Sequence, residues 1–333
     1  MKIVVIGSGS WGTGLAQVLC DNKEDVIIYG NCESEILDIQ NNHKNSKYFE
    51  DVELNLNLCA TTDINVVKDA DVIVLSVPTI AIESVCKEVD ALLDHKVIVV
   101  NTSKGFHPET FERMSEVIRK NISPDHLSSV VSLIGPSHAE EVVIRMLTTI
   151  CAVSLNEEDA QKIQKLFSND YLRIYTGTDE IGSEVGVAVK NAIALASGVL
   201  YGLGYGDNTR AALITRGLME MTRYGVALGG RQETFMGLTG IGDLIVTCTS
   251  KHSRNFQAGY EIGKHNSAKY FWENNTKTVE GVRTAKAVYE NAKRLGIDMP
   301  IVNEIYRVMF EDKNPEDSAK DLMLRDLKAE IRF

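Results

Sequence analysis

The sequence predicts a two-domain α/β protein, in which a doubly wound parallel sheet is followed by a mainly α-helical domain. Three observations support this prediction. The chain has 333 residues, and single hydrophobic cores stop growing at roughly 250–300 residues. Its first half repeats short apolar runs rich in β-branched residues, whereas its second half has apolar residues at helical spacing.

The predicted strands alternate with helical patterns up to about residue 178. They lie at 2–7, 25–30, 71–77, 96–103 and 129–135, with further strands expected at 148–155 and 171–177. Strands that are apolar throughout are typical of a parallel sheet covered on both faces. We therefore expect residues 1–178 to form the doubly wound domain.

Beyond residue 178 the strand signals stop, and we expect residues 179–333 to form a helical substrate and catalytic domain. The first predicted helix of this domain is apolar nearly all round, which is typical of a core helix. Lys190 and Asn191 interrupt its apolar surface.

Composition and charge exclude several classes of protein. Apolar residues make up 44% of the chain and charged residues 24%, as in ordinary globular proteins. A net charge of −11 disfavours binding to nucleic acid or to an anionic membrane surface. Neither a secretory signal nor an apolar run of ~20 residues is present, so we expect a cytoplasmic protein without membrane insertion.

The cysteines indicate neither disulfides nor a metal site. No two of them form a CxxC pair, and several lie in apolar runs, so we expect reduced packing residues and no bound metal. They are Cys20, Cys32, Cys59, Cys86, Cys151 and Cys248.

A glycine-rich turn follows the first predicted strand and opens a helical pattern. Residues 7–12 read GSGSWG, which matches the Rossmann GxGxxG pattern for dinucleotides. Gly7 would make the tight turn, Gly9 would let the backbone approach a pyrophosphate, and Gly12 would let the helix pack closely on the strand. Ser10 and Trp11 are then placed to contact the dinucleotide at the helix N-terminus.

The end of the second predicted strand bears on the choice between NAD and NADP. An acidic residue there would bind the ribose 2′-hydroxyl of NAD, and an arginine would accommodate the 2′-phosphate of NADP. Asn31 is neutral, and Glu33 comes two residues later. The cofactor preference therefore stays open.

Lys190 is the candidate catalytic residue of the second half. An ammonium group is costly to bury unless it is paired or its pKa falls, and burial is how proteins turn lysine into a general acid/base. The alternative is a lysine that extends along a partly exposed face. The adjoining Asn191 and the wider polar pattern favour the catalytic interpretation.

Other polar residues suit an anionic substrate. Arg254, between Ser253 and Asn255, is a candidate phosphate clamp, because a guanidinium group matches phosphate oxygens in a bidentate manner. Residues 102–105 and 135–139 follow predicted strands at the sheet edge where ligands bind. His138 lies in the second of these segments, where packing or helix capping is the expected role.

Together these segments resemble bacterial NAD(P)-dependent glycerol-3-phosphate dehydrogenases almost from end to end. The resemblance implies hydride transfer between a nicotinamide cofactor, NAD or NADP, and a small-molecule substrate, glycerol 3-phosphate or dihydroxyacetone phosphate. It further implies a supply of glycerol 3-phosphate for phospholipid synthesis and a homodimer. The matching segments are 7–14, 101–106, 135–142, 189–221, 240–244, 247–255 and 279–286.

The resemblance also assigns roles residue by residue. It makes Lys190 the catalytic lysine, and it places the dinucleotide against the glycine-rich turn. The implied substrate contacts are Lys104, Gly135, Ser137, Lys190, Asp243, Ser253, Arg254 and Asn255. The implied cofactor contacts are Gly7, Gly9, Ser10, Trp11, Gly12, Lys104, Ala139, Arg254, Val279 and Glu280.

The chain departs from the family pattern at two places. Asn31 stands where relatives often have arginine or histidine, which bears on NADP preference. Residues 49–51 replace a proline-glycine turn on an expected surface excursion.

Two other functions are compatible with this plan. One is a β-hydroxyacid or 6-phosphogluconate dehydrogenase, for which a substrate carboxylate would need its own clamp. The other is a dinucleotide-sensing protein without chemistry, which would have no need of Lys190. A panel of substrates distinguishes the first alternative from a glycerol-3-phosphate dehydrogenase. A single-turnover measurement of hydride transfer distinguishes the second alternative from an enzyme.

Overall fold

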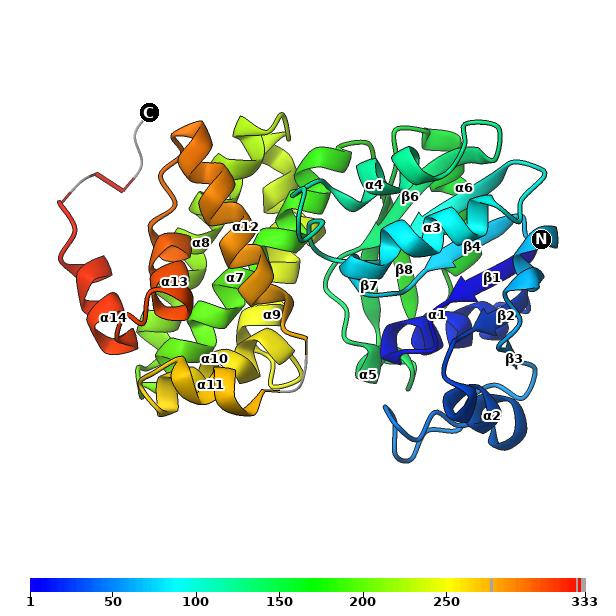
Figure 1. Ribbon diagram of the computed structural model, residues 1–333, viewed down its shortest axis with the longest axis horizontal. Helices are drawn as coiled ribbons and strands as arrows, with labels where there is room; N and C mark the ends of the chain where they lie inside the picture. Colours follow the sequence, from blue (N-terminus) through cyan, green and yellow to red (C-terminus); the bar gives the residue numbers. More distant parts are fainter. Residues whose placement is uncertain (276–277, 328, 331–333) are drawn as a thin grey trace. The chain divides into compact units, whose positions relative to one another are not determined.

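The computed structural model describes residues 1–275, 278–327 and 329–330 (Figure 1). Eight strands form one sheet in the order β3-β2-β1-β4-β5-β6-β7-β8. All neighbouring strands are parallel except β6 and β7, which are antiparallel. The strands are β1 (Lys2–Ile6), β2 (Asp25–Tyr29), β3 (Cys59–Thr61), β4 (Val72–Leu75), β5 (Val97–Asn101), β6 (Leu127–Ile134), β7 (Thr148–Val153) and β8 (Leu172–Gly177).

The predicted doubly wound sheet is confirmed, with two differences. β3 is absent from the predicted strands, because its three residues are too few to show a pattern. The sequence also predicts a parallel sheet throughout, whereas β7 runs antiparallel to β6. The helix between these two strands, α5 (Ala139–Val142), has four residues and is about 6 Å long, so it cannot return the chain along the eight-residue β6 for a parallel crossover.

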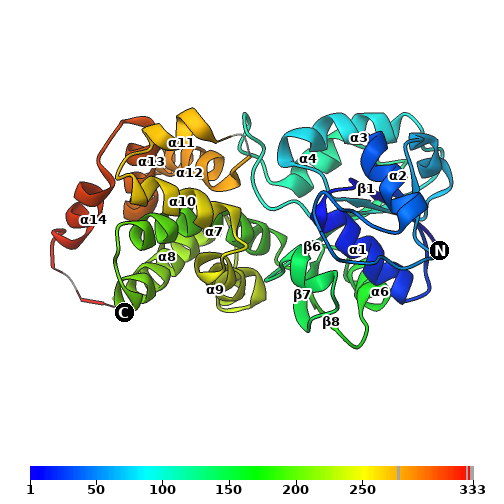
Figure 2. The same ribbon diagram turned by 90° about the horizontal axis from the view of Figure 1, so that it is seen from below.

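Each face of the sheet has its own hydrophobic core. Ile3 and Val5 of β1 pack with α1 (Ser10–Asp21), α5 and α6 (Glu157–Phe167). Val4 and Ile6 of the same strand pack on the other face with α3 (Ile82–Asp90) and α4 (Met114–Asn121). Figure 2 shows α1 and α6 on one side of the strands and α3 and α4 on the other. This alternation explains why β1 is apolar at every interior position.

The remaining elements before β8 are short or lie at the edge of the sheet. α2 (Glu33–Asn42) follows β2 and contacts β3. Single 3-10 turns span Ile64–Asp69 and Thr79–Ala81. Local capping fixes several helix ends: for example, the Asn156 side chain accepts a hydrogen bond from the Asp159 amide at the start of α6.

In the part of the chain after Gly177 that the structure describes, every regular element is a helix, as predicted. Short 3-10 and π turns lie at Gln232–Met236 and Leu238–Gly242. The α-helices are α7 (Glu180–Gly202), α8 (Asp207–Ala227), α9 (Asp243–Thr249), α10 (Arg254–Lys264), α11 (Lys269–Asn274), α12 (Glu280–Leu295), α13 (Pro300–Phe310) and α14 (Pro315–Met323).

The chain divides into two compact units. The first comprises Met1–Ala188 with Gly225–Val246, and the second comprises Val189–Tyr224 with Thr247–Phe333. The first unit therefore contains the sheet, the start of α7 and the later segment Gly225–Val246. The domain boundary predicted after residue 178 marks the change from strand-rich to helical sequence, and it stays a prediction.

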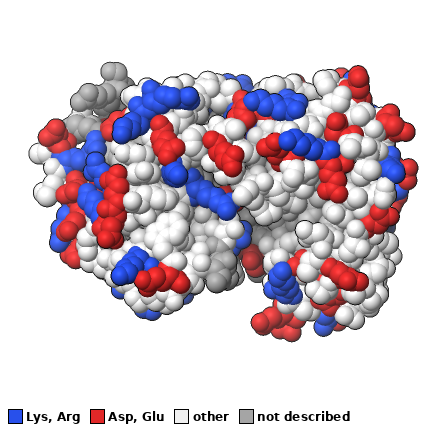
Figure 3. Space-filling model, viewed as in Figure 1, with Lys and Arg blue, Asp and Glu red and all other residues white. Residues whose placement is uncertain are grey.

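Helix α7 is long and apolar enough to cross a membrane, but it is mostly buried within the protein, as core helices of soluble proteins are. The six cysteines, all within the described residues, form no disulfide with one another. Among the residues that the structure describes, no group of three or more His, Cys, Asp or Glu side chains is arranged to hold a metal ion. Lys and Arg side chains are interspersed with Asp and Glu on the face shown in Figure 3.

Candidate active site

The glycine-rich loop joins β1 to α1, and each of its three glycines has a distinct environment. Gly7 has a φ of 116°, and a Cβ there would lie 2.3 Å from the Ser76 carbonyl oxygen. A Cβ on Gly12 would lie 1.9 Å from the carbonyl oxygen of Gly7. Around Gly9, in contrast, nothing lies within 4 Å of a built Cβ. The loop is thus tightly turned and closely packed at both ends and open in the middle.

The open middle of the loop leads into the N-terminus of α1. Ser10 and Trp11 are the first two residues of this helix, and Gly9 is its N-cap. The first amides of a helix have no partners within it and attract anions. The indole Nε1 of Trp11 is buried and has no hydrogen-bond partner in the structure. The open space above Gly9 and this indole N–H fit a dinucleotide.

An acidic residue that the sequence analysis overlooked contacts the loop. Glu35 lies on α2, and its Oε2 accepts a hydrogen bond of 2.7 Å from Ser8 Oγ, between the first two glycines. Asn31 and Glu33 are the candidates that the local sequence indicates, because they lie close in sequence to the end of β2. Glu35 lies two residues beyond Glu33 on α2, and the turn of the helix directs its side chain toward the loop.

Lys104 lies just beyond the end of β5. Its Nζ donates a hydrogen bond of 2.6 Å to the Gly135 carbonyl, lies 3.5 Å from Ser137 Oγ, and forms an ion pair of 3.2 Å with Asp243 Oδ2. Asp243 begins α9 and is almost fully buried. The structure therefore brings together four of the predicted substrate contacts: Lys104, Gly135, Ser137 and Asp243.

Hydrogen bonds hold the segment that carries Lys104. Thr102 Oγ1 donates to the Leu75 carbonyl at 2.9 Å, and Ser103 Oγ donates to the Val77 carbonyl at 2.6 Å. The buried side chain of Asn101 accepts from the Ser103 amide at 3.1 Å. These bonds tie the end of β5 to the end of β4, so the position of Lys104 is well defined.

A buried polar network, which the sequence does not reveal, holds the side chain of Asn101 at the end of β5. Asn101 Nδ2 donates to Ser132 Oγ at 3.3 Å, and Ser132 Oγ donates to Glu184 Oε1 at 2.8 Å. Arg113 forms an ion pair of 3.1 Å with Glu184. Burial raises the pKa of Glu184, and the nearby Glu180 raises it further, against the opposing charge of Arg113. No spacing in the sequence announces this network, because its members come from four elements.

The segment after β6, residues 135–139, contacts Lys104 at one end and α1, the helix that follows the glycine-rich loop, at the other. Gly135 has a φ of 148°, and a Cβ there would lie 3.0 Å from the Ile150 backbone. His138 is the N-cap of α5 by its backbone, and its side chain makes no capping hydrogen bond. Ala139 opens α5 and is buried, and its carbonyl oxygen lies 3.8 Å from a Cβ built on Gly14 of α1. Ala139 therefore lies beside the helix that begins at the glycine-rich loop.

In the second unit, Lys190 is buried on α7. Its side chain does not extend into solvent: the residue is 4% exposed, and Nζ donates a hydrogen bond of 2.7 Å to Thr247 Oγ1 on α9. Thr247 is itself buried. Nothing in the sequence indicates this contact, because the two residues are 57 positions apart.

A second polar chain in this unit joins three helices. Asn255 Nδ2 donates to Asn191 Oδ1 at 2.9 Å, and Asn255 Oδ1 accepts from the Gly281 amide at 2.8 Å. Gly281 follows the predicted cofactor contacts Val279 and Glu280, which are the N-cap and first residue of α12. Asn255 therefore positions the start of α12 relative to α7.

The predicted phosphate clamp lies at the N-terminus of α10. Ser253 is the N-cap, and its Oγ accepts a hydrogen bond of 3.2 Å from the Phe256 amide. Arg254 is the first helical residue and is exposed. A helix N-terminus and a guanidinium group at one place both attract phosphate. Ser253 is buried and serves the cap, so Arg254 is the residue of this cluster that is free to reach a ligand.

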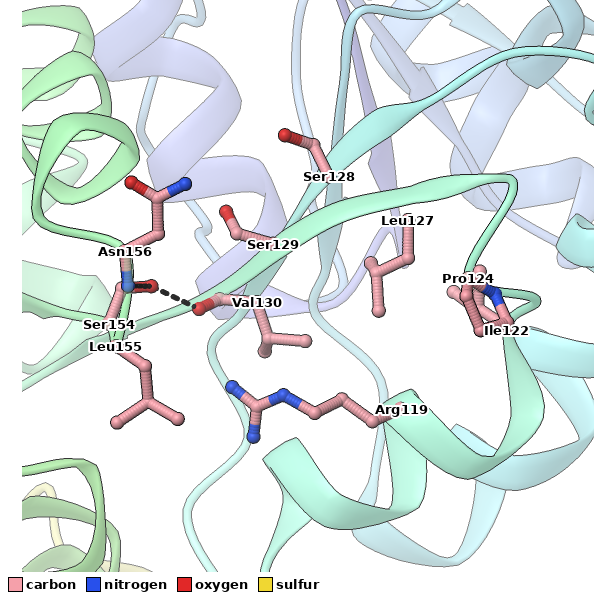
Figure 4. Close-up of a pocket in the computed structure, with 10 residues that line it drawn as sticks. All are labelled: Arg119, Ile122, Pro124, Leu127, Ser128, Ser129, Val130, Ser154, Leu155 and Asn156. Carbon is pink, nitrogen blue, oxygen red and sulfur yellow. Dashed lines mark hydrogen bonds between the residues drawn. The ribbon is translucent and has the colours of Figure 1, made fainter.

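A hollow of about 430 Å³ in the first unit lies away from these groups (Figure 4). Its lining includes the first half of β6 and the residues after β7, where Ser154 Oγ donates to the Val130 carbonyl at 2.7 Å. Ligands of parallel sheets bind at the carboxyl ends of the strands, which is the opposite end of β6. The candidate active site therefore lies outside this hollow.

A Rossmann-type fold with an open glycine-rich loop, followed by helices that bury a lysine, defines the class of nicotinamide-dependent dehydrogenases. Comparison with known proteins then specifies the family. The NAD-dependent glycerol-3-phosphate dehydrogenase N-terminus family model matches residues 2–160, and the corresponding C-terminus model matches residues 179–320. The chain belongs to the NAD-dependent glycerol-3-phosphate dehydrogenase family.

Individual relatives agree with this assignment over the full length of the chain. A protein of Enterococcus faecalis named glycerol-3-phosphate dehydrogenase, NAD(P)+, is 48% identical over 100% of this chain and 98% of its own length. A protein of the same name from Staphylococcus haemolyticus is 47% identical over 99% of both chains. The crystal structure of glycerol-3-phosphate dehydrogenase from Coxiella burnetii has a TM-score of 0.91 at 31% identity, covering 97% of this chain and 99% of that chain. The family predicted from the sequence is confirmed.

Proposed function

We propose that the protein interconverts glycerol 3-phosphate and dihydroxyacetone phosphate, using NAD(H) or NADP(H). The observation that carries this proposal is the buried lysine: Lys190 Nζ is hydrogen-bonded to Thr247 Oγ1 inside a family whose relatives are named for this reaction. When bound, the nicotinamide supplies hydride transfer to or from C2 of the three-carbon phosphate. In the direction of reduction, the reaction supplies glycerol 3-phosphate for phospholipid synthesis.

Lys190 is proposed as the general acid/base. During reduction its ammonium group donates a proton to the oxygen on C2, and during oxidation its neutral amine accepts that proton. Thr247 Oγ1 accepts a hydrogen bond from Nζ, which fixes the direction in which the remaining N–H bonds point. Thr247 is thus a positioning residue, which acts through Lys190.

Lys104 and Asp243 are proposed to hold the substrate. Their ion pair of 3.2 Å is largely buried, and a buried pair keeps its geometry only while both charges are present. Gly135 and Ser137 complete this group through their contacts with Lys104 Nζ. The ammonium group of Lys104 is shared among these oxygens and orients polar atoms of the substrate.

The phosphate group of the substrate is proposed to bind Arg254 and the N-terminus of α10. The guanidinium fork matches two phosphate oxygens, and the first amides of the helix add donors and a partial positive charge. Ser253 and Asn255 support this arrangement by capping the helix and by anchoring it to α7 and α12. Arg254 also reaches the cofactor, together with Val279 and Glu280.

The dinucleotide is proposed to bind along the glycine-rich loop. Gly9 admits the pyrophosphate, Ser10 and Trp11 provide donors at the start of α1, and Gly7 and Gly12 shape the turn. Lys104 and Ala139 line the same edge of the sheet.

The decisive experiment follows oxidation of NADH and of NADPH by absorbance, with dihydroxyacetone phosphate as the substrate. We expect turnover with this substrate, none with 3-oxoacids, and no reduction of NAD⁺ or NADP⁺ when 6-phosphogluconate is supplied. Turnover of those compounds instead would favour the β-hydroxyacid dehydrogenase group. Cofactor binding without hydride transfer in a single-turnover experiment would favour a sensing protein.

We also infer a cytoplasmic homodimer, from family resemblance. Sedimentation equilibrium of the purified protein measures the mass in solution. A mass of one chain at micromolar concentration would contradict the dimer.

A further inference from the structure

The carboxylate of Glu35 is buried beside the glycine-rich loop. The residue is 7% exposed, and its Oε2 accepts the hydrogen bond from Ser8 Oγ. Burial alone would raise its pKa, but hydrogen bonds from Lys47 and Ser8 outweigh burial and lower the pKa below its ordinary value. Glu35 therefore places a negative charge under the loop.

Lys47 supplies the matching positive charge. Its Nζ lies 2.5 Å from Glu35 Oε1, yet its side chain is 61% exposed. The segment around it is held against the loop, because Asn45 Nδ2 donates to both the Ser8 carbonyl and Thr13 Oγ1 at 2.8 Å. Lys47 is thus a partly exposed cation that two successive side-chain contacts connect to the glycine-rich loop.

The place of this ion pair matters for cofactor choice. In dinucleotide-binding folds the adenosine ribose lies at the end of the second strand, beside the glycine-rich loop. NADP(H) differs from NAD(H) by a phosphate on the ribose 2′-oxygen, which needs a cation nearby. The end of β2 offers the neutral Asn31 instead of an acid or an arginine. An unpaired Glu35 would repel the phosphate. Lys47 neutralises the charge of Glu35, and the Lys47 side chain is itself largely exposed to solvent.

We propose that the Glu35–Lys47 pair sets the choice between NADP(H) and NAD(H). Lys47 provides the cation for the adenosine 2′-phosphate, and Glu35 holds Lys47 in place while weakening its pull on that phosphate. This inference rests on the proposed use of a nicotinamide dinucleotide. It predicts opposite effects for the removal of the two partners.

The test measures dissociation constants of NADPH and NADH for the free protein by calorimetry. Lys47→Met should weaken NADPH binding about tenfold or more, since one charge-assisted contact is lost, and should change NADH binding by no more than about threefold. Glu35→Gln keeps an oxygen acceptor for Ser8 but removes the charge. It should raise the NADPH preference by about three- to tenfold, because Lys47 is no longer neutralised.

Lys87 offers a matched control. Its side chain is also 61% exposed, and its Nζ also lies 2.5 Å from a carboxylate, that of Glu83, on α3. Lys87→Met should therefore leave the ratio of the two dissociation constants unchanged. Raising the salt concentration should reduce the NADPH preference of the wild-type protein and of Glu35→Gln, whereas it should not reduce that preference in Lys47→Met, where the unpaired Glu35 repels the phosphate.

Two results would overturn the inference. Equal weakening of both cofactors in Lys47→Met and Glu35→Gln would assign the pair a merely structural role. An unchanged NADPH affinity in Lys47→Met would place the 2′-phosphate elsewhere. A wild-type protein that binds both cofactors but does not reduce dihydroxyacetone phosphate would refute the proposed function alone, since these binding measurements do not depend on turnover.

Discussion

Replacement of Lys190 by methionine tests the assignment of proton transfer most directly. Methionine fills a similar volume without a charge, so the helix should remain folded. General acid/base groups contribute ~10²–10⁴-fold to rate, and kcat should fall by at least the lower figure. Because the glycine-rich loop belongs to the other unit, the dissociation constant for the cofactor should change little.

A variant of Thr247 measures how much of the rate contribution of Lys190 depends on its hydrogen bond with Thr247. A hydrogen bond to a charged group contributes ~1.5–3 kcal/mol, so Thr247→Val should lower kcat by about 10- to 100-fold if the bond of 2.7 Å aligns the ammonium group. Thr247 acts only through Lys190 in this scheme. The double variant should therefore be no slower than Lys190→Met alone.

The assay is steady-state oxidation of NADH and NADPH at saturating dihydroxyacetone phosphate, across a range of pH. Thr247→Val should also shift the pH profile of kcat, which a loss of packing alone would not do. Lys251→Met, at an exposed lysine, serves as the control for charge removal. Near wild-type kcat in Lys190→Met would refute the assignment, and additive losses in the double variant would refute the role of Thr247.

Three further predictions concern other parts of the chain. Asn31→Arg should shift the ratio of kcat/KM toward NADPH, since a guanidinium group would pair with the 2′-phosphate; an unchanged ratio counts against this. Arg254→Ala should lower kcat/KM for dihydroxyacetone phosphate by tens- to thousands-fold (about 2–5 kcal/mol) and affect unphosphorylated dihydroxyacetone far less, whereas equal losses would reassign Arg254 to the dinucleotide. Burial raises the pKa of Glu220, which accepts hydrogen bonds from the Ile301 and Val302 amides, to about 8. Between its ordinary pKa and that value the folded protein retains a proton that the unfolded chain releases, so the free energy of unfolding should fall as pH rises through this window. Urea denaturation at about pH 5 and about pH 8.5 should show a smaller fall for Glu220→Gln, and equal falls would contradict it.

The features that the sequence by itself determined are those written in local patterns. Apolar residues at successive positions of β1 and β4 indicate strands buried on both faces, because each residue meets one of two cores. The GxGxxG pattern between a strand and a helix predicts the open loop at Gly9, since backbone conformation there depends on neighbouring residues. A lysine within an apolar helix likewise points to Lys190. Each of these signals is contained within a few turns of chain.

Only the tertiary structure decided the contacts between distant segments. Lys104 pairs with Asp243 across a separation of 139 residues, and Lys190 meets Thr247 across 57. Glu35 reaches Ser8, and Glu184 reaches Ser132, through the packing of helices on the sheet. The reversal of β7 also belongs here, because it depends on how far a short connection can carry the chain. Such contacts are set by the summed geometry of all the elements between the partners, and a polar residue shows no sign in its own neighbourhood of which distant group it will meet.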